Sequence, residues 1–243
     1  MSAGDGGAYA VAAPLSETIR DILRPRRIEV QILNTHPIIT GWAEEPKGTL
    51  VAEVVAFLAT RRGCATREQL RAALYPAGIS DSTLRSLLTR VRIALGSDVL
   101  SNRNPLRLSE QVGCDWARFQ DLFTLARNTT GADKRELLTA ALSLVEGQPF
   151  SATARETFSW AEDPYNHLAQ HMRTMIINAA TACAGAAAED GEQVIYAARK
   201  GLLGGNDNAE LLRILARALL EAQRPDEARI VLARLRSLDC ETQ

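Results

Sequence analysis

The fold is decided by residues 80–108, which have the sequence SDSTLRSLLTRVRIALGSDVLSNRNPLRL. At about 100° per residue, the apolar side chains of the first half fall on one narrow stripe of a helix, and these are Leu84, Leu88, Val91 and Leu95. Short polar side chains fall roughly opposite that stripe, at Ser82, Ser86 and Thr89. Arg85 and Arg90 lie on the flanks of the polar face. The pattern predicts an amphipathic helix with one apolar edge and one Ser/Thr/Arg face.

This polar face suits a helix that lies in the major groove of DNA. Base edges in the groove are recognised by hydrogen bonds, and the neighbouring phosphates are held by charge. We therefore expect DNA contacts from the residues of this face, which are Ser82, Arg85, Ser86, Thr89 and Arg90. An ordinary solvated helix face is the alternative. Arg92 lies at the edge of the apolar stripe, so it either holds a phosphate or braces the helix through an internal carboxylate.

Residues 99–108 predict a short hairpin directly after this helix. Val99-Leu100-Ser101 and Leu106-Arg107-Leu108 are the expected strands, and residues 102–105 between them have the composition of a turn. We expect Arg103 at the tip and Arg107 on the second strand to contact phosphates. A helix followed by a charged hairpin is typical of a winged helix-turn-helix domain, which points to DNA.

Composition shifts divide the chain into three predicted segments. Residues 1–27 begin with Ser, Ala and Gly and carry only a weak amphipathic stretch over residues 15–23, which indicates a flexible tail or linker. Residues 28–113 are predicted to form the winged-helix DNA-binding domain. Its other expected elements are strands at residues 28–33 and 37–41 and helices at residues 48–60 and 66–76. Residues 114–243 are predicted to form a second, α-helical domain.

The second domain has the pattern of one helix after another. Asp115 is expected to cap the first helix, Asp133 to begin the next, and Pro164 to open a long one. Gly191–Ile195 aligns with Pro225–Arg229 at an offset of 34 residues. Paired helices with this period are typical of tetratricopeptide-like α-α repeats, which usually bind proteins. The predicted fold class is therefore mainly α, with a winged helix-turn-helix followed by a tetratricopeptide-like domain.

Charge is distributed unevenly, although the net charge is only −1. Residues 61–107 hold nine arginines and three acidic residues, a local charge of +6, whereas residues 114–243 hold 14 basic and 18 acidic residues, a local charge of −4. A basic segment followed by an acidic one fits a DNA-binding domain joined to a protein-binding domain. Arg61 and Arg62 are further candidates for phosphate contacts. Chance clustering of surface charge is the alternative.

Several classes of protein are disfavoured by what the sequence lacks. No run of about 18 apolar residues predicts a membrane span, and the N-terminus lacks the basic start and apolar core of a signal peptide, so we expect a cytoplasmic protein. The cysteines have no short ligand spacing and are expected to be free thiols, at Cys64, Cys114, Cys183 and Cys240. No phosphate-binding glycine loop, Ser/His/Asp arrangement or pair of catalytic carboxylates appears. We expect no enzymatic activity and no cofactor.

Two histidines have a spacing that is typical of metal ligands on a helix. His167 and His171 stand four residues apart on a predicted helix, with Asp163 one turn earlier, and such a pair can present two imidazoles to zinc. The helix has neither the intervening glutamate of a zinc protease nor an evident third ligand, so we favour surface histidines and no metal. Three aromatic residues could line a ligand groove but are more simply explained as helix-packing core, at Trp116, Phe119 and Trp160.

Four motifs together resemble a known family. They are TLRSLLTRVRIALG at residues 83–96, CDWARF at residues 114–119, AALSLVEGQPF at residues 140–150 and WAE at residues 160–162. The first looks like the recognition helix of the antibiotic-pathway regulators of streptomycetes (the SARP family), and the others look like their bacterial transcriptional activator domain. The chain is similar above all to activator domains of actinobacterial proteins, some of which carry LysM or membrane segments.

The resemblance implies a transcriptional activator that binds double-stranded DNA at promoter repeats, where two copies can sit as a dimer, and recruits RNA polymerase through its helical domain. One departure keeps an alternative open. The wing of that family usually contains Gly-Tyr-x-Leu, whereas this chain has Asn104-Pro105-Leu106-Arg107-Leu108. The alternative is a non-catalytic interaction module whose winged helix no longer binds DNA and docks a protein instead.

Overall fold

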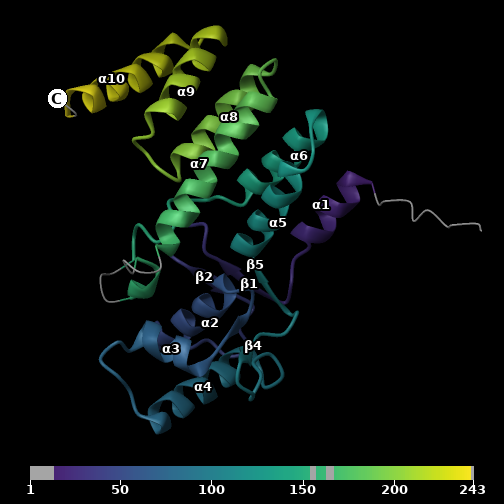
Figure 1. Ribbon diagram of the computed structural model, residues 1–243, viewed down its shortest axis with the longest axis vertical. Coiled ribbons are helices and arrows are strands. Elements are labelled where there is room, and N and C mark those ends of the chain that lie inside the picture. The colour runs from purple at the N-terminus through teal and green to yellow at the C-terminus, as the bar shows by residue number, and fades with distance from the viewer. Residues whose placement is uncertain (1–13, 154–156, 163–166, 242–243) are drawn as a thin grey trace, which may run out of the picture.

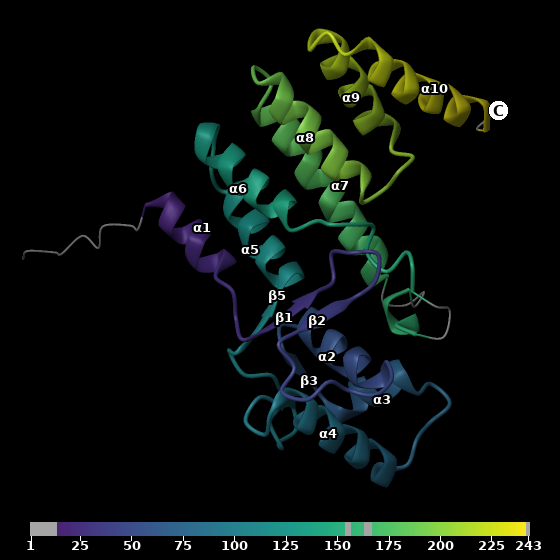
Figure 2. The same ribbon diagram turned by 180° about the vertical axis from the view of Figure 1, so that it is seen from behind.

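The chain is mainly helical with a small sheet, which confirms the predicted fold class at that level. A computed structural model describes residues 14–153, 157–162 and 167–241. We call residues 28–114 the sheet-containing part and residues 115–241 the helical part. The strands and helices of the sheet-containing part lie at one end of the molecule, and the helices of the helical part form a row that extends from it (Figures 1 and 2).

The central strand of the sheet is β1, Ile28–Gln31. It pairs antiparallel with β2, Ile38–Thr40, and parallel with β5, Val112–Cys114. Ile28 and Val30 are fully buried, as the alternation of apolar and polar residues predicts. The sequence predicted β1 and β2 but not β5, because three residues are too few to show a recognisable alternation.

Helix α2, Leu50–Thr60, packs against the sheet and is buried on nearly all sides. Its buried residues include Val54, Val55, Phe57 and Leu58. The helix was expected to begin at Gly48. Gly48 has a φ of 79°, which is outside the right-handed helical region, so the helix begins two residues later.

Helix α3, Arg67–Leu74, begins with a capping box, which confirms the start predicted at Thr66. Thr66 Oγ1 accepts a hydrogen bond from the Gln69 N–H at 3.1 Å, and the Gln69 side chain accepts one from the Thr66 N–H at 2.9 Å. These two bonds satisfy backbone donors that a helix start otherwise leaves unpaired.

Helix α4, Asp81–Leu95, is the amphipathic helix predicted from residues 80–108. Ser80 is its N-cap and accepts a hydrogen bond from the Thr83 N–H at 3.2 Å. The predicted apolar stripe is buried in full, at Leu84, Leu88, Val91 and Leu95. This stripe packs against α2, so the position of α4 depends on that of α2.

The hairpin predicted after α4 is formed by residues 99–108. Leu100 and Leu108 make an antiparallel bridge, and the Ser101 N–H donates to the Arg107 carbonyl at 2.9 Å. Its second arm contains β4, Leu106–Arg107, which also pairs antiparallel with β3, Cys64–Ala65. The sequence did not predict β3, because a two-residue strand has no pattern of its own.

In the helical part, successive helices pack side by side along the row (Figure 1). The elements are α5 Asp115–Arg127, α6 Gly131–Ser143, the 3-10 helix η1 Ser159–Ala161, α7 Leu168–Ala186, α8 Gly191–Leu202, α9 Ala209–Glu221 and α10 Pro225–Glu241. Helices α8 and α10 begin 34 residues apart, which is the offset found in the sequence. Pro164, the expected start of the long helix, lies outside the described residues.

Asp115 joins the two parts of the molecule. Its carboxylate is 6% exposed and accepts hydrogen bonds from the N–H groups of Ile32 at 2.8 Å and Leu33 at 2.9 Å, just beyond β1. It also accepts the Trp116 N–H at 2.6 Å. Asp115 was expected to cap α5, but the N-cap is Cys114 and Asp115 is the first residue of the helix. The carboxylate therefore ties β1 to α5 in addition to its local bond.

No linker separates the two parts where the domain boundary was expected, at residues 113–114. Strand β5 ends at Cys114 and α5 begins at Asp115. The buried side chains form one continuous cluster through both parts. A second link crosses between them, because the buried carboxylate of Glu53 on α2 accepts the Phe158 N–H at 2.9 Å.

A short helix, α1, occupies Leu15–Leu23, where a flexible tail or linker was expected over residues 1–27. Its half-buried apolar residues pack against the core beside α5 and α6, at Leu15, Ile19, Ile22 and Leu23. A helix this short is held by burial of its apolar face rather than by helix propensity, so the amphipathic stretch of residues 15–23 forms an ordered helix only because the core lies beside it. Residues 1–13 lie outside the described residues.

Removing the Asp115 carboxylate should destabilise the protein. Asp115→Ala leaves the N–H groups of Ile32 and Leu33 buried without their acceptor, so we expect the free energy of unfolding to fall by about 3 kcal/mol, at about 1–3 kcal/mol per unsatisfied donor. Asp115→Asn keeps one acceptor oxygen and should lose less. Urea denaturation followed by circular dichroism measures both losses. An Ala variant as stable as the wild type would contradict the role assigned to Asp115.

The same carboxylate should make stability depend on pH. Burial raises the pKa of Asp115 to about 6, against the lowering effect of its hydrogen bonds with the N–H groups of Ile32, Leu33 and Trp116. The folded protein then takes up this proton at a higher pH than the unfolded chain, so the stabilisation present at low pH is lost as the pH rises through about 6. Between about pH 7 and about pH 5, the wild type should gain stability relative to Asp115→Asn. Parallel pH dependences of the two proteins in urea denaturation would contradict this assignment.

Candidate nucleic-acid interface

One exposed face of α4 carries all the residues that the sequence placed on it. They are Ser82, Arg85, Ser86, Thr89 and Arg90, and each is exposed. The opposite side of the helix is the buried leucine stripe, so these side chains cannot turn into the core without displacing it. The face therefore presents two guanidinium groups and three hydroxyl groups to solvent.

Part of this face is ordered by bonds within the helix. Arg85 Nε donates to the Asp81 carbonyl at 3.2 Å, and Thr89 Oγ1 donates to the Arg85 carbonyl at 3.0 Å. Ser82 Oγ lies 2.8 Å from Ser80 Oγ at the helix start. Because a guanidinium has further N–H groups at its Nη atoms and a hydroxyl can still accept, these bonds leave hydrogen-bonding capacity for a ligand.

Arg92 braces α4 against the hairpin. Its Nε donates to the Leu100 carbonyl at 3.3 Å and its Nη2 to the Ser101 carbonyl at 3.0 Å. Burial and the neighbouring Arg67 guanidinium lower the pKa of Arg92. Of its two expected roles the structure shows the internal brace, with backbone carbonyls as partners in place of the carboxylate that was expected.

The two arginines expected on the wing are exposed, Arg103 in the hairpin loop and Arg107 on β4. The loop docks on the start of α3. Asn104 Oδ1 accepts the Arg67 N–H at 3.0 Å, and Arg67 Nη2 donates to the Asn102 carbonyl at 3.1 Å. The loop that carries Arg103 is thereby fixed beside the helix pair.

A groove of about 390 Å³ lies between α3 and α4. Its lining residues are Arg67, Glu68, Arg71, Asp81, Leu84, Arg85 and Leu88. Arg71 forms an ion pair with Asp81. The Nε–H groups of Arg67 and Arg71 are buried, and neither has a hydrogen-bond partner within the described residues. Unsatisfied guanidinium donors favour an anionic acceptor such as a phosphate oxygen.

Arg67 and Arg71 contribute to the local charge of residues 61–107, but they were not among the residues predicted for the site. The signal that could have identified them is their spacing. Residues four apart on a helix lie on the same face, and α3 directly precedes α4 in the chain. The sequence did not show that this face of α3 and the residues around Arg85 of α4 line one groove.

Arg61 and Arg62 make their contacts away from the α4 face, Arg61 with α2 and Arg62 with the helical part. Arg62 Nη2 pairs with Asp121 of α5 at 2.7 Å. The guanidinium carbon of Arg61 lies 4.7 Å from the centre of the Phe57 ring. Both arginines follow the last residue of α2, and the structure gives them these internal contacts where phosphate contacts were expected.

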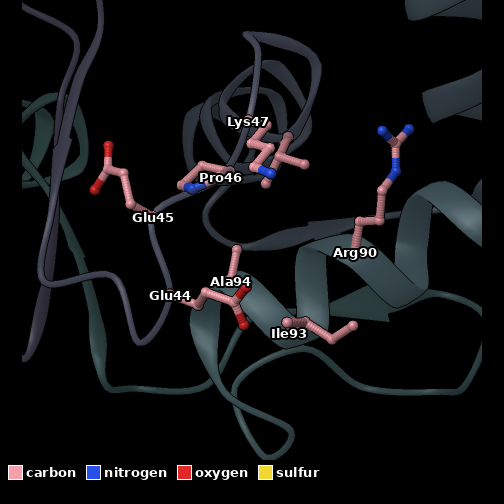
Figure 3. A pocket seen from close by; sticks show the side chains of 8 residues that line it. Glu44, Glu45, Pro46, Lys47, Arg90, Ile93 and Ala94 are labelled. Atoms are coloured by element: carbon pink, nitrogen blue, oxygen red, sulfur yellow. The ribbon is translucent and has the colours of Figure 1, made fainter.

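A second pocket of about 390 Å³ lies on the flank of α4 (Figure 3). Arg90, Ile93 and Ala94 come from α4, whereas Glu44, Glu45, Pro46 and Lys47 come from the segment before α2. Ile93 is 54% exposed, and the Glu44 N–H donates to the Ala94 carbonyl at 3.2 Å, which holds the segment against the helix. Two carboxylates therefore border the positive face of α4 on this side.

The histidine pair has no metal-like surroundings within the described residues. The His171 ring lies edge-on to Trp116 with ring centres 5.9 Å apart, and His167 is the residue before α7. Asp163 lies outside the described residues. In residues 14–153, 157–162 and 167–241, no group of three or more His, Cys, Asp and Glu side chains can hold a metal ion. Over the same ranges, no helix has the length and apolar character needed to cross a membrane.

The aromatic residues considered for a ligand groove are buried in the core, and one of them, Trp160, also lines a cavity. Trp116 and Phe119 stack with ring centres 5.7 Å apart, and Trp160 meets Phe57 edge-on at 5.3 Å. All four cysteines are free thiols. Burial raises the pKa of Cys114 to about 12, so this thiol stays protonated near neutral pH.

No family model matches the chain, and no curated protein matches it. The proposed function therefore rests on the residues of the interface itself.

Replacing Arg92 should lower the stability of the hairpin, because the Arg92 side chain bonds to the hairpin backbone. Arg92→Gln removes two half-buried bonds to backbone carbonyls, so we expect the free energy of unfolding to fall by about 1–3 kcal/mol. Arg85→Gln is the matched control on the same helix, and it should leave stability unchanged because Arg85 is exposed. Urea denaturation measures stability, and hydrogen exchange of the Ser101 and Leu108 amides reports on the hairpin. Equal stability of the two variants would contradict the brace.

Proposed function

We propose that the protein is a DNA-binding transcriptional regulator without catalytic activity. The observation that carries the proposal is the exposed face of α4, where Arg85 and Arg90 flank three hydroxyl groups. It is supported by the adjoining groove, in which Arg67 and Arg71 have buried N–H groups without an acceptor among the described residues. A helix with such a face fits the major groove, and arginines beside it fit the DNA phosphates.

In this proposal, residues 28–113 are a winged helix-turn-helix domain. Helices α3 and α4 are the helix pair, α4 is the recognition helix, and residues 99–108 are the wing. Ser82, Ser86 and Thr89 then face base edges. Arg103 and Arg107 hold phosphates from the wing, and the docking of Asn104 on α3 supports this by fixing the loop next to the helix pair.

The helical part is proposed to bind proteins as a tetratricopeptide-like domain. The common 34-residue offset of α8 and α10 supports this assignment. The local charge of −4 in residues 114–243 disfavours DNA as its partner. By its resemblance to the streptomycete regulators, we propose that this domain recruits RNA polymerase to promoter repeats in the cytoplasm, with two copies on the DNA.

The pocket on the flank of α4 favours a second candidate function, a non-catalytic interaction module. Exposed Ile93 offers an apolar contact, and Glu44 and Glu45 beside it repel phosphates. A protein docked there would cover the same helix that DNA needs. The two candidates differ in whether the full chain binds duplex DNA.

Affinity for DNA should depend steeply on salt. With three or four phosphate contacts, the slope of log affinity against log salt is expected to be about −3 to −4 on random-sequence duplex. Arg85→Gln, Arg90→Gln and Arg71→Gln should each reduce the slope by about one if the arginine holds a phosphate, or weaken binding by about 1–3 kcal/mol if it contacts a base. Fluorescence anisotropy over a salt series measures both quantities.

Arg217→Gln is the matched control for these variants, because Arg217 is an exposed arginine on α9, in the helical part. It should leave affinity and slope unchanged. If the full chain does not bind duplex DNA even at low salt, the proposed regulator function is wrong. The interaction module then remains as the candidate function. Equal effects of Arg217→Gln and Arg85→Gln would mean that the protein binds DNA only through its overall charge.

Removing the acidic border of the α4 face should strengthen DNA binding. Two unit charges about 10 Å apart interact by about 0.4 kcal/mol in water, so the double variant Glu44→Gln, Glu45→Gln should raise affinity by about twofold to fourfold at low salt. Screening should remove the gain at high salt. The matched control is Glu189→Gln, which neutralises an exposed carboxylate in the helical part. If the double variant binds DNA no more tightly than this control, DNA does not lie near this flank of α4.

A further inference from the structure

A cavity of about 190 Å³ lies between the C-terminal end of α2 and the start of α7, at the boundary between the two parts of the molecule. Its lining residues are Phe57, Thr60, Arg61, Trp160 and Leu168. They come from the C-terminal end of α2, from η1 and from the first residue of α7. Three segments that are far apart in the sequence therefore build one site.

Two donors at this cavity have no acceptor within the described residues. Trp160 is 4% exposed, and its Nε1–H is buried without a hydrogen-bond partner. The guanidinium of Arg61 has no ion pair or hydrogen bond in the described part of the chain and lies over the Phe57 ring, whereas its neighbour Arg62 is paired with Asp121. A buried donor without an acceptor costs about 1–3 kcal/mol, so a ligand that supplies an acceptor to Trp160 Nε1 gains affinity here, and the exposed Arg61 adds a positive charge.

Of the remaining lining residues, Phe57 and Leu168 are apolar, and the hydroxyl of Thr60 donates to the Phe57 carbonyl at 2.8 Å. Phe57 and Trp160 meet edge-on with ring centres 5.3 Å apart, and Leu168 closes the cavity from α7. A cavity of about 150 Å³ is large enough for benzene, so the space here accommodates one aromatic ring. Apolar walls with a few polar groups that fix orientation are typical of small-molecule sites.

We propose that this cavity binds a small apolar carboxylate, which is a single ring, or an aliphatic chain of similar volume, that bears one carboxylate group. The carboxylate accepts hydrogen bonds from Arg61 and from Trp160 Nε1. The bond to the guanidinium is charge-assisted, which makes it stronger than a bond between neutral groups. The apolar body lies against Phe57, Trp160 and Leu168. The site goes beyond DNA binding and does not depend on it.

The position of the cavity gives such a ligand a structural consequence. The segment of Phe158 and Trp160 already contacts α2 twice, through the hydrogen bond to Glu53 and the ring contact with Phe57. A carboxylate held by Arg61 and Trp160 joins the same two segments a third time. Because α2 packs against α4, the ligand stabilises the contact that positions α4 against the helical part.

Benzoate is the probe that tests the proposal, because it has one ring and one carboxylate. Isothermal titration of the full chain without DNA should show saturable binding of benzoate, with much weaker binding of acetate, which lacks the ring, and of benzyl alcohol, which lacks the charge. Arg61→Gln should weaken benzoate binding about tenfold or more, the factor expected for loss of a bond to a charged group. Trp160→Phe keeps most of the ring volume and removes the donor, so it should also weaken binding.

Arg62→Gln is the matched control, because Arg62 is adjacent in sequence but pairs with Asp121 and does not line the cavity. It should bind benzoate as the wild type does. If Trp160→Phe fails to fold, Arg61→Gln carries the test alone, since Arg61 is exposed and its loss leaves the core intact. The proposal is overturned by a wild type without saturable benzoate binding, by equal affinity for the three probes, or by an Arg61→Gln variant that binds like the wild type.

Discussion

The carboxylate of Asp115 lies buried between the end of β1 and the start of α5, and the relation between the two parts of the molecule depends on it. A buried carboxylate is tolerated when donors surround it, and here the N–H groups of Ile32, Leu33 and Trp116 do so. Next to it, Arg118 of α5 pairs with Glu29 of β1 through both Nη atoms. The junction is therefore part of the core and not a linker, which couples the stability of the two parts.

Helix α2 extends this coupling to α4. On one side its Glu53 and Phe57 hold the segment around Phe158 and Trp160, and on the other it packs against the buried stripe of α4. The exposed face of α4 is thus presented by a helix that the helical part holds in place. The helical part, the cavity between Arg61 and Trp160, and α4 all adjoin one continuous core. Binding of a protein, a small ligand or DNA at these three places therefore acts on the same core.

The chain has a net charge of −1 but presents a positive face, because its arginines differ in whether they are paired within the molecule or exposed. Arg62, Arg92 and Arg118 are engaged inside the molecule by Asp121, by backbone carbonyls and by Glu29. The exposed arginines of α4 and the partly unsatisfied ones of α3 lie together on one side of the sheet-containing part. Local placement, rather than total charge, decides whether phosphates are attracted.

Features that depend on spacing within one helix could be predicted from the sequence. It predicted the buried stripe of α4, the start of α3 at Thr66 and the shared face of Ser82, Arg85 and Thr89, because positions three and four apart on a helix have a fixed geometry. Contacts between residues far apart in the chain became known only from the folded arrangement of the elements. Asp115 bonds to a strand end 83 residues away, β5 pairs with β1, and Arg92 turns to the hairpin. Such contacts follow from how packed elements bring distant residues together, and no local pattern encodes them.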